Sequence, residues 1–156
     1  ILLVYLALYE NLWDEEYKKD KEKITALSNR QKFRFEIAEK QINKLIQQVK
    51  RSQAIYIRGG DVAVLRSYMD KVKNLKSLLE DKVIAGSSAG ACIFAKYYYS
   101  NDRDQIEEGM GILAIKVYCH YNENKKENLI KLQNFKERLE TFPIEEGNFV
   151  IIRSPF

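Results

Sequence analysis

The sequence predicts an α/β protein, a three-layer sandwich in which a mostly parallel central sheet is flanked by helices. Short apolar runs recur along the chain, and stretches with helical periodicity separate them. Glycine or small polar residues follow several of the runs directly. Strands that alternate with helices form parallel sheets, because each crossover helix returns the chain to the same end of the sheet. We therefore expect one α/β domain over residues 1–156.

The expected strands are the apolar segments 1–8, 54–57, 82–85, 115–120 and 148–152. The first is apolar almost throughout, as buried parallel strands are. Helices are expected where apolar residues recur every three to four positions, at 33–49, 62–79, 91–99 and 125–139. Asp61 is suited to cap the second of these helices. Residues 9–32 and 100–111 are polar and predict loops, the first of them with a short helix.

The composition is that of a globular protein, with 156 residues, 46% of them hydrophobic and 31% charged. The net charge is only +4, and the lysines near residue 20 alternate with acids, so no nucleic-acid partner is expected. The longest apolar run is too short to cross a membrane, so no membrane partner is expected either. Two cysteines form no disulfide framework, which favours a cytoplasmic location. A single histidine and no Cys-x-x-Cys pair give little support to a metal site, and no cofactor is expected.

The most informative feature is Gly86-Ser87-Ser88-Ala89-Gly90, between an expected strand and an expected helix. A strand, a sharp turn of small residues and a helix form the context of a G-x-S-x-G nucleophile elbow. Ser88 is then expected to project from the carboxyl end of the sheet, at the positive end of the helix. An ordinary turn has a similar composition, so the prediction depends on whether Ser88 has partners.

His120 is the only histidine of the chain, and it ends an expected strand. An imidazole can accept the serine proton and return it to a leaving group. Asp102 is one candidate for the acid that orients this imidazole. The alternatives lie in the same loop and are Asp104, Glu107 and Glu108. The competing interpretations are a strand-end histidine without function and four solvated loop acids.

Backbone amides are expected to stabilise the oxyanion. Ala89 follows the nucleophile and supplies one donor. Gly59 and Gly60 end another strand and offer the second, because no Cβ keeps a ligand away from their backbone. The carboxyl ends of neighbouring parallel strands meet at one edge of a sheet, so these glycines, Ser88 and His120 are expected on one rim. A plain strand-to-helix turn is the alternative for the glycine pair.

Three other side chains near these positions have simpler interpretations. Arg58 is expected either to meet a substrate carboxylate or to be a surface charge. Cys119 and His120 are neighbours on a strand and point to opposite faces, which disfavours a Cys-His dyad. Cys92 lies in an apolar segment and is expected in the core.

With these residues identified, the sequence resembles the serine peptidase family of aspartyl dipeptidase (dipeptidase E) and cyanophycinase. The matching blocks are residues 55–61, 83–91, 100–102, 109–113 with 119–121 and, more weakly, 144–149. The elbow, similar to the family's Gly-x-Ser-Ala-Gly-Ala, is the most specific of them. The resemblance implies a fold like the class I glutamine amidotransferases (flavodoxin-like). It makes Ser88 the nucleophile, His120 the base and Asp102 the acid, with Gly60 and Ala89 as oxyanion donors.

The chain also departs from the family pattern. Val62 stands where cyanophycinases carry Gln, and residues 122–126 replace the arginines that often follow the family histidine. The chain is expected to be truncated at both ends. We therefore expect a serine-type peptidase that hydrolyses short peptides through an acyl-enzyme, with its side-chain preference open. The alternatives are an inactive peptide- or amino-acid-binding module and a small esterase, and a homodimer is left open.

Overall fold

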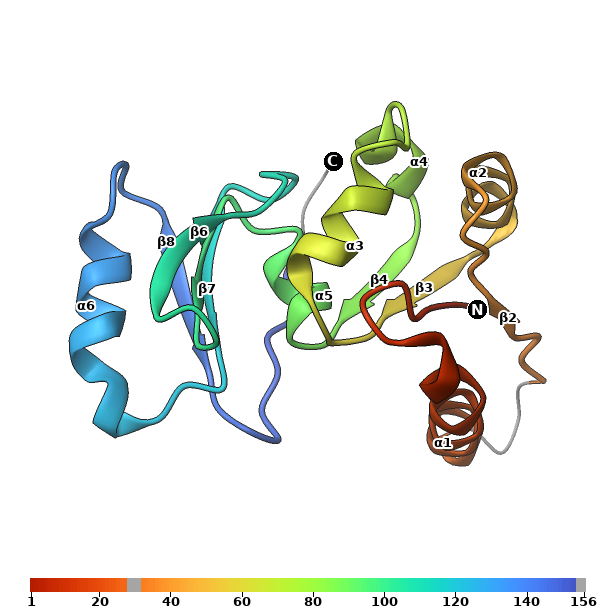
Figure 1. Ribbon diagram of the computed structural model, residues 1–156, viewed down its shortest axis with the longest axis horizontal. Helices are drawn as coiled ribbons and strands as arrows, with labels where there is room; N and C mark the ends of the chain where they lie inside the picture. Colours follow the sequence, from red (N-terminus) through yellow and green to blue (C-terminus); the bar gives the residue numbers. More distant parts are fainter. Residues whose placement is uncertain (28–31, 154–156) are drawn as a thin grey trace. The chain divides into compact units, whose positions relative to one another are not determined.

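The computed structural model describes residues 1–27 and 32–153, which form two compact units, residues 1–90 and residues from 91 onward. Each unit contains its own four-stranded sheet (Figure 1). Strand pairing is parallel throughout the first sheet and for two of the three pairs of the second. The α/β class with mostly parallel sheets is therefore confirmed, while the single domain over 1–156 stays a prediction.

The first sheet has the order β2-β1-β3-β4. Its strands are Glu36–Ile37 (β2), Leu2–Val4 (β1), Ala54–Ile57 (β3) and Val83–Gly86 (β4). The three residues of β1 are at most 1% exposed, because this strand is central in the sheet. The apolar run at the start of the chain thus forms a buried parallel strand, although a shorter one than the expected 1–8.

The helices of the first unit are α1, Trp13–Ala26; α2, Ile42–Arg51; α3, Val62–Met69; and α4, Leu75–Leu79; a 3-10 turn, Glu10–Leu12, precedes α1. Helix α1 covers one face of the sheet, and the other three cover the opposite face (Figure 1). Right-handed crossovers require this arrangement, because β1 to β2 runs in the opposite direction across the sheet from β2 to β3 and β3 to β4. The cap of α3 is confirmed, since Asp61 Oδ1 accepts hydrogen bonds from the backbone N–H of Ala63 (2.7 Å) and Val64 (3.1 Å).

Two expected helices of this unit were wrong in their extent. The helix expected from residue 33 begins only at Ile42, because residues 36–37 pair with β1. The Gln48 side chain fixes this turn into α2 by donating to the Ile37 carbonyl (2.8 Å) and accepting from the Glu39 N–H (2.9 Å). The helix expected over 62–79 breaks where Asn74 takes a left-handed conformation (φ 55°), which asparagine tolerates better than most residues.

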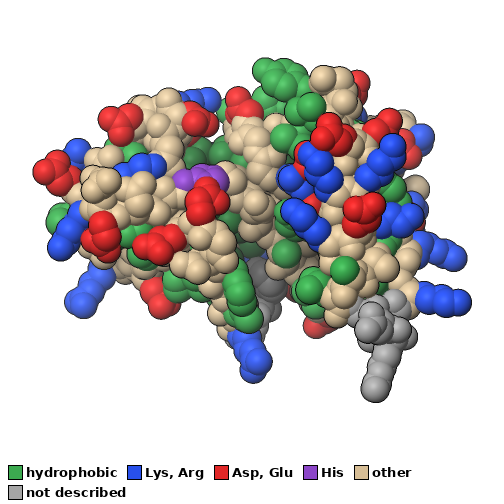
Figure 2. All heavy atoms as spheres, turned by 90° about the horizontal axis from the view of Figure 1, so that it is seen from below, with side chains coloured by type: hydrophobic (Ala, Val, Ile, Leu, Met, Phe, Trp, Pro, Cys, Tyr) green, Lys and Arg blue, Asp and Glu red, His purple; other side chains and the backbone are tan. Residues whose placement is uncertain are grey.

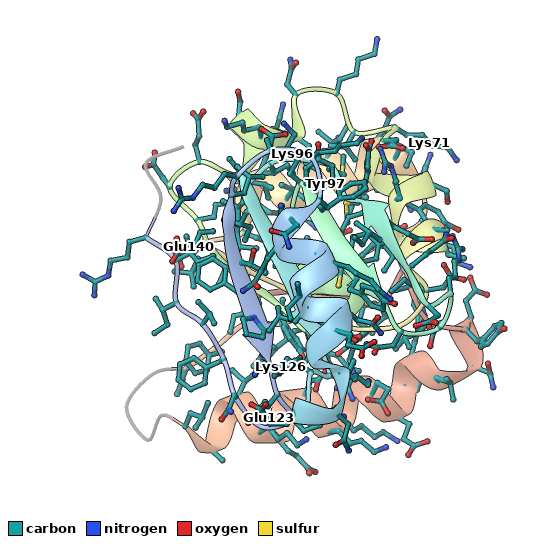
Figure 3. All side chains as sticks on the ribbon, turned by 90° about the vertical axis from the view of Figure 1, so that its left-hand side faces the viewer. Lys71, Lys96, Tyr97, Glu123, Lys126 and Glu140 are labelled. Carbon is teal, nitrogen blue, oxygen red and sulfur yellow. The ribbon has the colours of Figure 1, made fainter. Side chains whose placement is uncertain are left out.

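The second sheet has the order β6-β5-β7-β8. Its strands are Gln105–Glu108 (β6), Tyr97–Ser100 (β5), Ile115–Cys119 (β7) and Glu140–Ile144 (β8). Helix α6, Lys126–Asn134, lies across one face of this sheet and starts near the labelled Lys126 (Figure 3). The core beneath it is a cluster of buried residues, Tyr97, Tyr99, Tyr118, Tyr121 and Leu132.

Several expectations for this unit were also wrong. The helix after the elbow is only α5, Ala89–Cys92, and Tyr97–Tyr99 belong to a strand. These tyrosines alternate between the two sheet faces: Tyr97 and Tyr99 enter the aromatic core, while Tyr98 bonds to Glu107. The expected loop 100–111 contains β6, which forms an antiparallel hairpin with β5. The last strand is Glu140–Ile144, and the expected 148–152 is exposed chain without strand structure.

Candidate active site

The predicted elbow lies between β4 and α5 in the structure. Strand β4 ends at Gly86, and Ser88 has a left-handed backbone (φ 49°), which is uncommon for a residue with a side chain. The N–H of Ser87 donates to the Ile57 carbonyl (2.9 Å), and the N–H of Gly90 donates to the Ser87 carbonyl (2.9 Å). The turn is therefore sharp and is anchored to β3. Since α5 has only four residues, the positive helix end expected next to Ser88 contributes little.

Gly59 lies directly against Ser88. A Cβ added at Gly59 would lie 3.0 Å from Ser88 Cβ and 3.7 Å from Ser88 Oγ. At Gly60 the backbone has φ +142°, and an added Cβ would lie 2.2 Å from the Ala7 carbonyl oxygen. At Gly90 an added Cβ would lie 2.1 Å from the Ile57 carbonyl oxygen. The chain around the serine is thus packed so closely that only glycine fits at Gly60 and Gly90.

Arg58 is engaged inside the first unit. Its guanidinium pairs with the carboxylates of Asp20 and Glu16 on α1, and Asp20 is buried. The Tyr5 hydroxyl also donates to Asp20 (3.1 Å), and burial together with the Asp20 charge raises the pKa of Tyr5. Removing Arg58 would leave the carboxylates of Asp20 and Glu16 without their cation, so the role of Arg58 is structural and its guanidinium is not available for a substrate carboxylate.

His120 follows β7 directly and also has a left-handed backbone (φ 56°). Its side chain is 46% exposed, and its Nδ1 contacts Glu146 Oε1. Figure 2 shows the imidazole at the surface with acidic side chains next to it. A carboxylate at Nδ1 accepts a hydrogen bond from the N–H at that nitrogen, so in the neutral ring Nε2 carries no proton. This is the tautomer that a general base requires.

Glu146 was missed as a partner of His120 by the sequence analysis. It lies in a turn after β8, in which Gly147 is left-handed (φ 78°) and the N–H of Asn148 donates to the Glu145 carbonyl (3.1 Å). Strands β7 and β8 are parallel neighbours, so the residues after their carboxyl ends lie at the same edge. The Glu-Gly-Asn block at 146–148 was the signal that could have identified it.

Asp102 lies in the exposed turn of the β5–β6 hairpin. The three alternative acids each bond to another side chain. Asp104 accepts from Tyr99 (2.8 Å), Glu107 accepts from Arg103 (2.8 Å) and from Tyr98, and Glu108 pairs with Lys136 (2.6 Å). Burial and the bond to Asp104 raise the pKa of Tyr99 to about 12. These acids therefore serve the hairpin, and Asp102 stays a prediction.

A pocket of about 580 Å³ opens beside the imidazole. All of its lining residues belong to the second unit: His120, Tyr121, Asn122, Lys125, Glu145 and Glu146. The amide, ammonium and carboxylate groups among these residues offer hydrogen-bond partners to a polar ligand next to the imidazole.

The two cysteines face each other in the core of the second unit. Both are buried, and their Sγ atoms lie 3.9 Å apart. The bond to Cys119 and burial raise the pKa of the Cys92 thiol well above its usual value, which disfavours a thiolate nucleophile. The core position predicted for Cys92 is confirmed. Among residues 1–27 and 32–153, no group of three or more His, Cys, Asp and Glu side chains could hold a metal ion.

The sequence profile of peptidase family S51 matches residues 14–154. The chain belongs to peptidase family S51. The resemblance to the dipeptidase E and cyanophycinase family is thereby confirmed, and with it membership of a serine peptidase family. Comparison with curated protein sequences gives no match. Within the described ranges, no helix is long and apolar enough to span a membrane.

Two solved structures are similar to this S51 member. A peptidase from an acI-B1 Actinobacterium has a TM-score of 0.65 and 20% identity, and the match covers 94% of this chain. A putative peptidase E from Listeria monocytogenes EGD-e has a TM-score of 0.61 and 19% identity over 92% of this chain. The chain spans 66% of the first protein and 76% of the second. Both likenesses confirm the α/β fold.

The structure thus brings together two pairs of predicted or newly found residues in this S51 member. Gly59 lies against Ser88 in the first unit, and Glu146 contacts His120 in the second. The roles of Ser88, His120, Asp102 and the oxyanion donors stay predictions, and they are taken up as a proposal below.

Proposed function

We propose that this S51 member is a serine-type peptidase that hydrolyses short peptides through an acyl-enzyme. The observation that carries the proposal is the tight elbow, in which Ser88 is left-handed and Gly59 lies directly against its side chain. A strained serine in a strand-to-helix turn is the arrangement that exposes a nucleophile in other hydrolase folds. The pocket beside His120, with its amide, ammonium and carboxylate groups, supports a peptide as the substrate.

In the proposed reaction, Ser88 Oγ attacks the scissile carbonyl while His120 Nε2 accepts the hydroxyl proton. The N–H groups of Ala89 and of the Gly59–Gly60 segment stabilise the negative oxygen of the tetrahedral intermediate. His120 then returns the proton to the leaving amine, and an ester bond to Ser88 remains. Water, deprotonated by His120, attacks this ester and releases the carboxylate product, which restores the serine hydroxyl.

We assign the acid that orients His120 to Glu146, because Glu146 Oε1 contacts the imidazole Nδ1. Asp102 is the acid that the family resemblance favours, and it is the alternative. Substituting Glu146→Gln is expected to reduce kcat about a hundredfold or more, since the neutral amide no longer stabilises the imidazolium. Asp102→Asn is the matched control, and a loss of activity confined to that variant would transfer the role to Asp102.

The nucleophile is tested by mass spectrometry after treatment of the intact chain with a fluorophosphonate. One adduct on Ser88 is expected, and none in the Ser88→Ala variant. An adduct that persists in Ser88→Ala would refute the assignment. His120→Ala is expected to slow the labelling strongly, because a serine hydroxyl without a base is a weak nucleophile.

The substrate is tested with dipeptides that begin with Asp, β-linked Asp or a neutral residue, and with simple esters. Faster turnover of a dipeptide than of the esters is expected. Turnover of esters alone would favour a small esterase. Saturable binding of a dipeptide without cleavage, together with an unlabelled Ser88, would favour an inactive binding module. The cytoplasmic location and a homodimer stay predictions.

A further inference from the structure

The backbone at His120 must leave the strand direction to present the imidazole. Cys119 is the last residue of β7 and is paired with Ile144 of β8. His120 then adopts φ 56°, a left-handed conformation that is energetically unfavourable for residues with a Cβ. The next residue returns to the sheet, since the Tyr121 N–H donates to the Ile144 carbonyl (3.1 Å). A strained single-residue turn of this kind persists only where its surroundings hold it.

Two side chains hold the peptide groups on both sides of His120, one from the turn between β5 and β6 and one from the 3-10 turn Glu123–Lys125. Asn101 Nδ2 donates to the Cys119 carbonyl (2.8 Å), and Lys125 Nζ donates to the His120 carbonyl (3.1 Å). The two side chains are also joined, because Lys125 Nζ donates to Asn101 Oδ1 (2.7 Å). The first peptide plane determines φ of His120 and the second determines ψ. The two side chains thus fix both backbone dihedrals of the turn.

We propose that Asn101 and Lys125 are positioning residues for the base, and that they hold His120 in the left-handed turn that aims its imidazole. This inference rests on the proposed serine peptidase function. The family resemblance assigns a role to Asp102 of the Ser-Asn-Asp block at 100–102, and this inference assigns one to Asn101 as well. Asn101 is the residue of this block that bonds to the backbone next to His120. Glu146 fixes the ring from its Nδ1 side, while Asn101 and Lys125 fix the backbone that carries it.

The charge of Lys125 could also act on the imidazole directly, so the test separates charge from hydrogen bonding. Lys125→Met removes the ammonium group, and Lys125→Arg keeps a cationic donor. Asn101→Leu removes the amide at nearly constant volume without any change of charge. Lys126→Met is the matched control, because Lys126 is an exposed lysine at the start of α6.

Two measurements are made on the intact chain and its variants. The first is the second-order rate constant for fluorophosphonate labelling of Ser88. The second is the imidazole Cε1–H resonance in the NMR spectrum, which is unambiguous because the chain has one histidine. Thermal melting of each variant shows that it is folded. If the wild-type chain were not labelled at all, the proposed function would fail, and the resonance would still decide the positioning role.

Lys125→Met and Asn101→Leu are each expected to slow the labelling about tenfold to a hundredfold, as small displacements of a catalytic group do. Both variants are expected to shift or broaden the His120 resonance. Lys125→Arg is expected to restore most of the rate, and Lys126→Met to change neither reading. The double variant is expected to lose less than the product of the single losses, because both side chains act on one turn. Wild-type rates and an unchanged resonance in both single variants would overturn the inference.

Discussion

Ser88 and His120 both have left-handed backbones, yet the two residues are held by different means. Around Ser88, backbone packs on backbone: the Cβ positions of Gly60 and Gly90 fall 2.2 Å and 2.1 Å from carbonyl oxygens. Around His120, side chains of Asn101, Lys125 and Glu146 bond to the backbone and to the ring. The closely packed backbone at Gly60 and Gly90 has no room for an added Cβ, whereas the side-chain bonds around His120 can be removed one at a time. A single substitution near Ser88 should therefore destabilise the turn strongly, and each substitution near His120 should reduce activity only in part.

The largest effect is expected for Gly60→Ala. The new Cβ would overlap the Ala7 carbonyl, and alanine disfavours the backbone conformation at φ +142°. We expect a loss of about 3 kcal/mol or more in the free energy of unfolding. The measurement is urea unfolding followed by the fluorescence of Trp13, the only tryptophan, which lies in α1 of the same unit. A loss below about 1 kcal/mol, which is the average effect of a single substitution on the free energy of unfolding, would show that the backbone around Gly60 moves to accommodate the Cβ.

The closely packed turn around Ser88 is also the part of the site that the local sequence predicts best. A strand, small residues and a cap at Asp61 are signals within a few positions of one another, and their geometry follows from local chain sterics. Gly59 beside Ser88 followed from the rule that carboxyl ends of parallel strands share an edge.

The surroundings of His120 were predicted less well, because they depend on pairing between distant segments. Tyr97–Tyr99 suit either a helix end or a strand, and only the partners of β5 decide between them. Glu146 meets His120 because β8 pairs with β7, and β8 is formed by Glu140–Ile144 rather than by the more apolar 148–152. Hydrophobic composition favoured 148–152 as the strand, because the hydrophobicity of a segment does not determine which distant strand it pairs with.

A smaller and more selective effect is expected for Gly59→Ala, the matched partner of Gly60→Ala. Here the added Cβ would meet the Ser88 side chain at 3.0 Å and the Ser87 carbonyl oxygen at 3.3 Å. Because contacts of this length are relieved by a shift of a few tenths of an ångström in Ser87 and Ser88, the stability loss should be about 1 kcal/mol. The displaced hydroxyl should nevertheless reduce fluorophosphonate labelling about tenfold or more. If stability fell as much as in Gly60→Ala while labelling of the folded fraction were unchanged, Gly59 would be part of the scaffold only.

The smallest effect near neutral pH concerns the tyrosine core that supports β7, and this effect depends on pH. Burial and the bond to Asp104 raise the pKa of Tyr99 to about 12, from an unfolded value of 10.0. The folded chain therefore keeps this proton at a pH where the unfolded chain has lost it. The stabilisation is fully present below pH 10 and is lost as the pH rises through about 12.

The free energy of unfolding of the wild type should accordingly fall between pH 10 and pH 12, and that of Tyr99→Phe should fall less steeply over the same range. Near neutral pH this variant should lose only about 1 kcal/mol, for the missing hydrogen bond to Asp104. Tyr9→Phe is the control, because Tyr9 is 83% exposed. Urea midpoints across this range measure both slopes. Equal slopes for wild type and Tyr99→Phe would mean that the aromatic core holds β7 and the base by packing alone, without a contribution from the buried phenol proton.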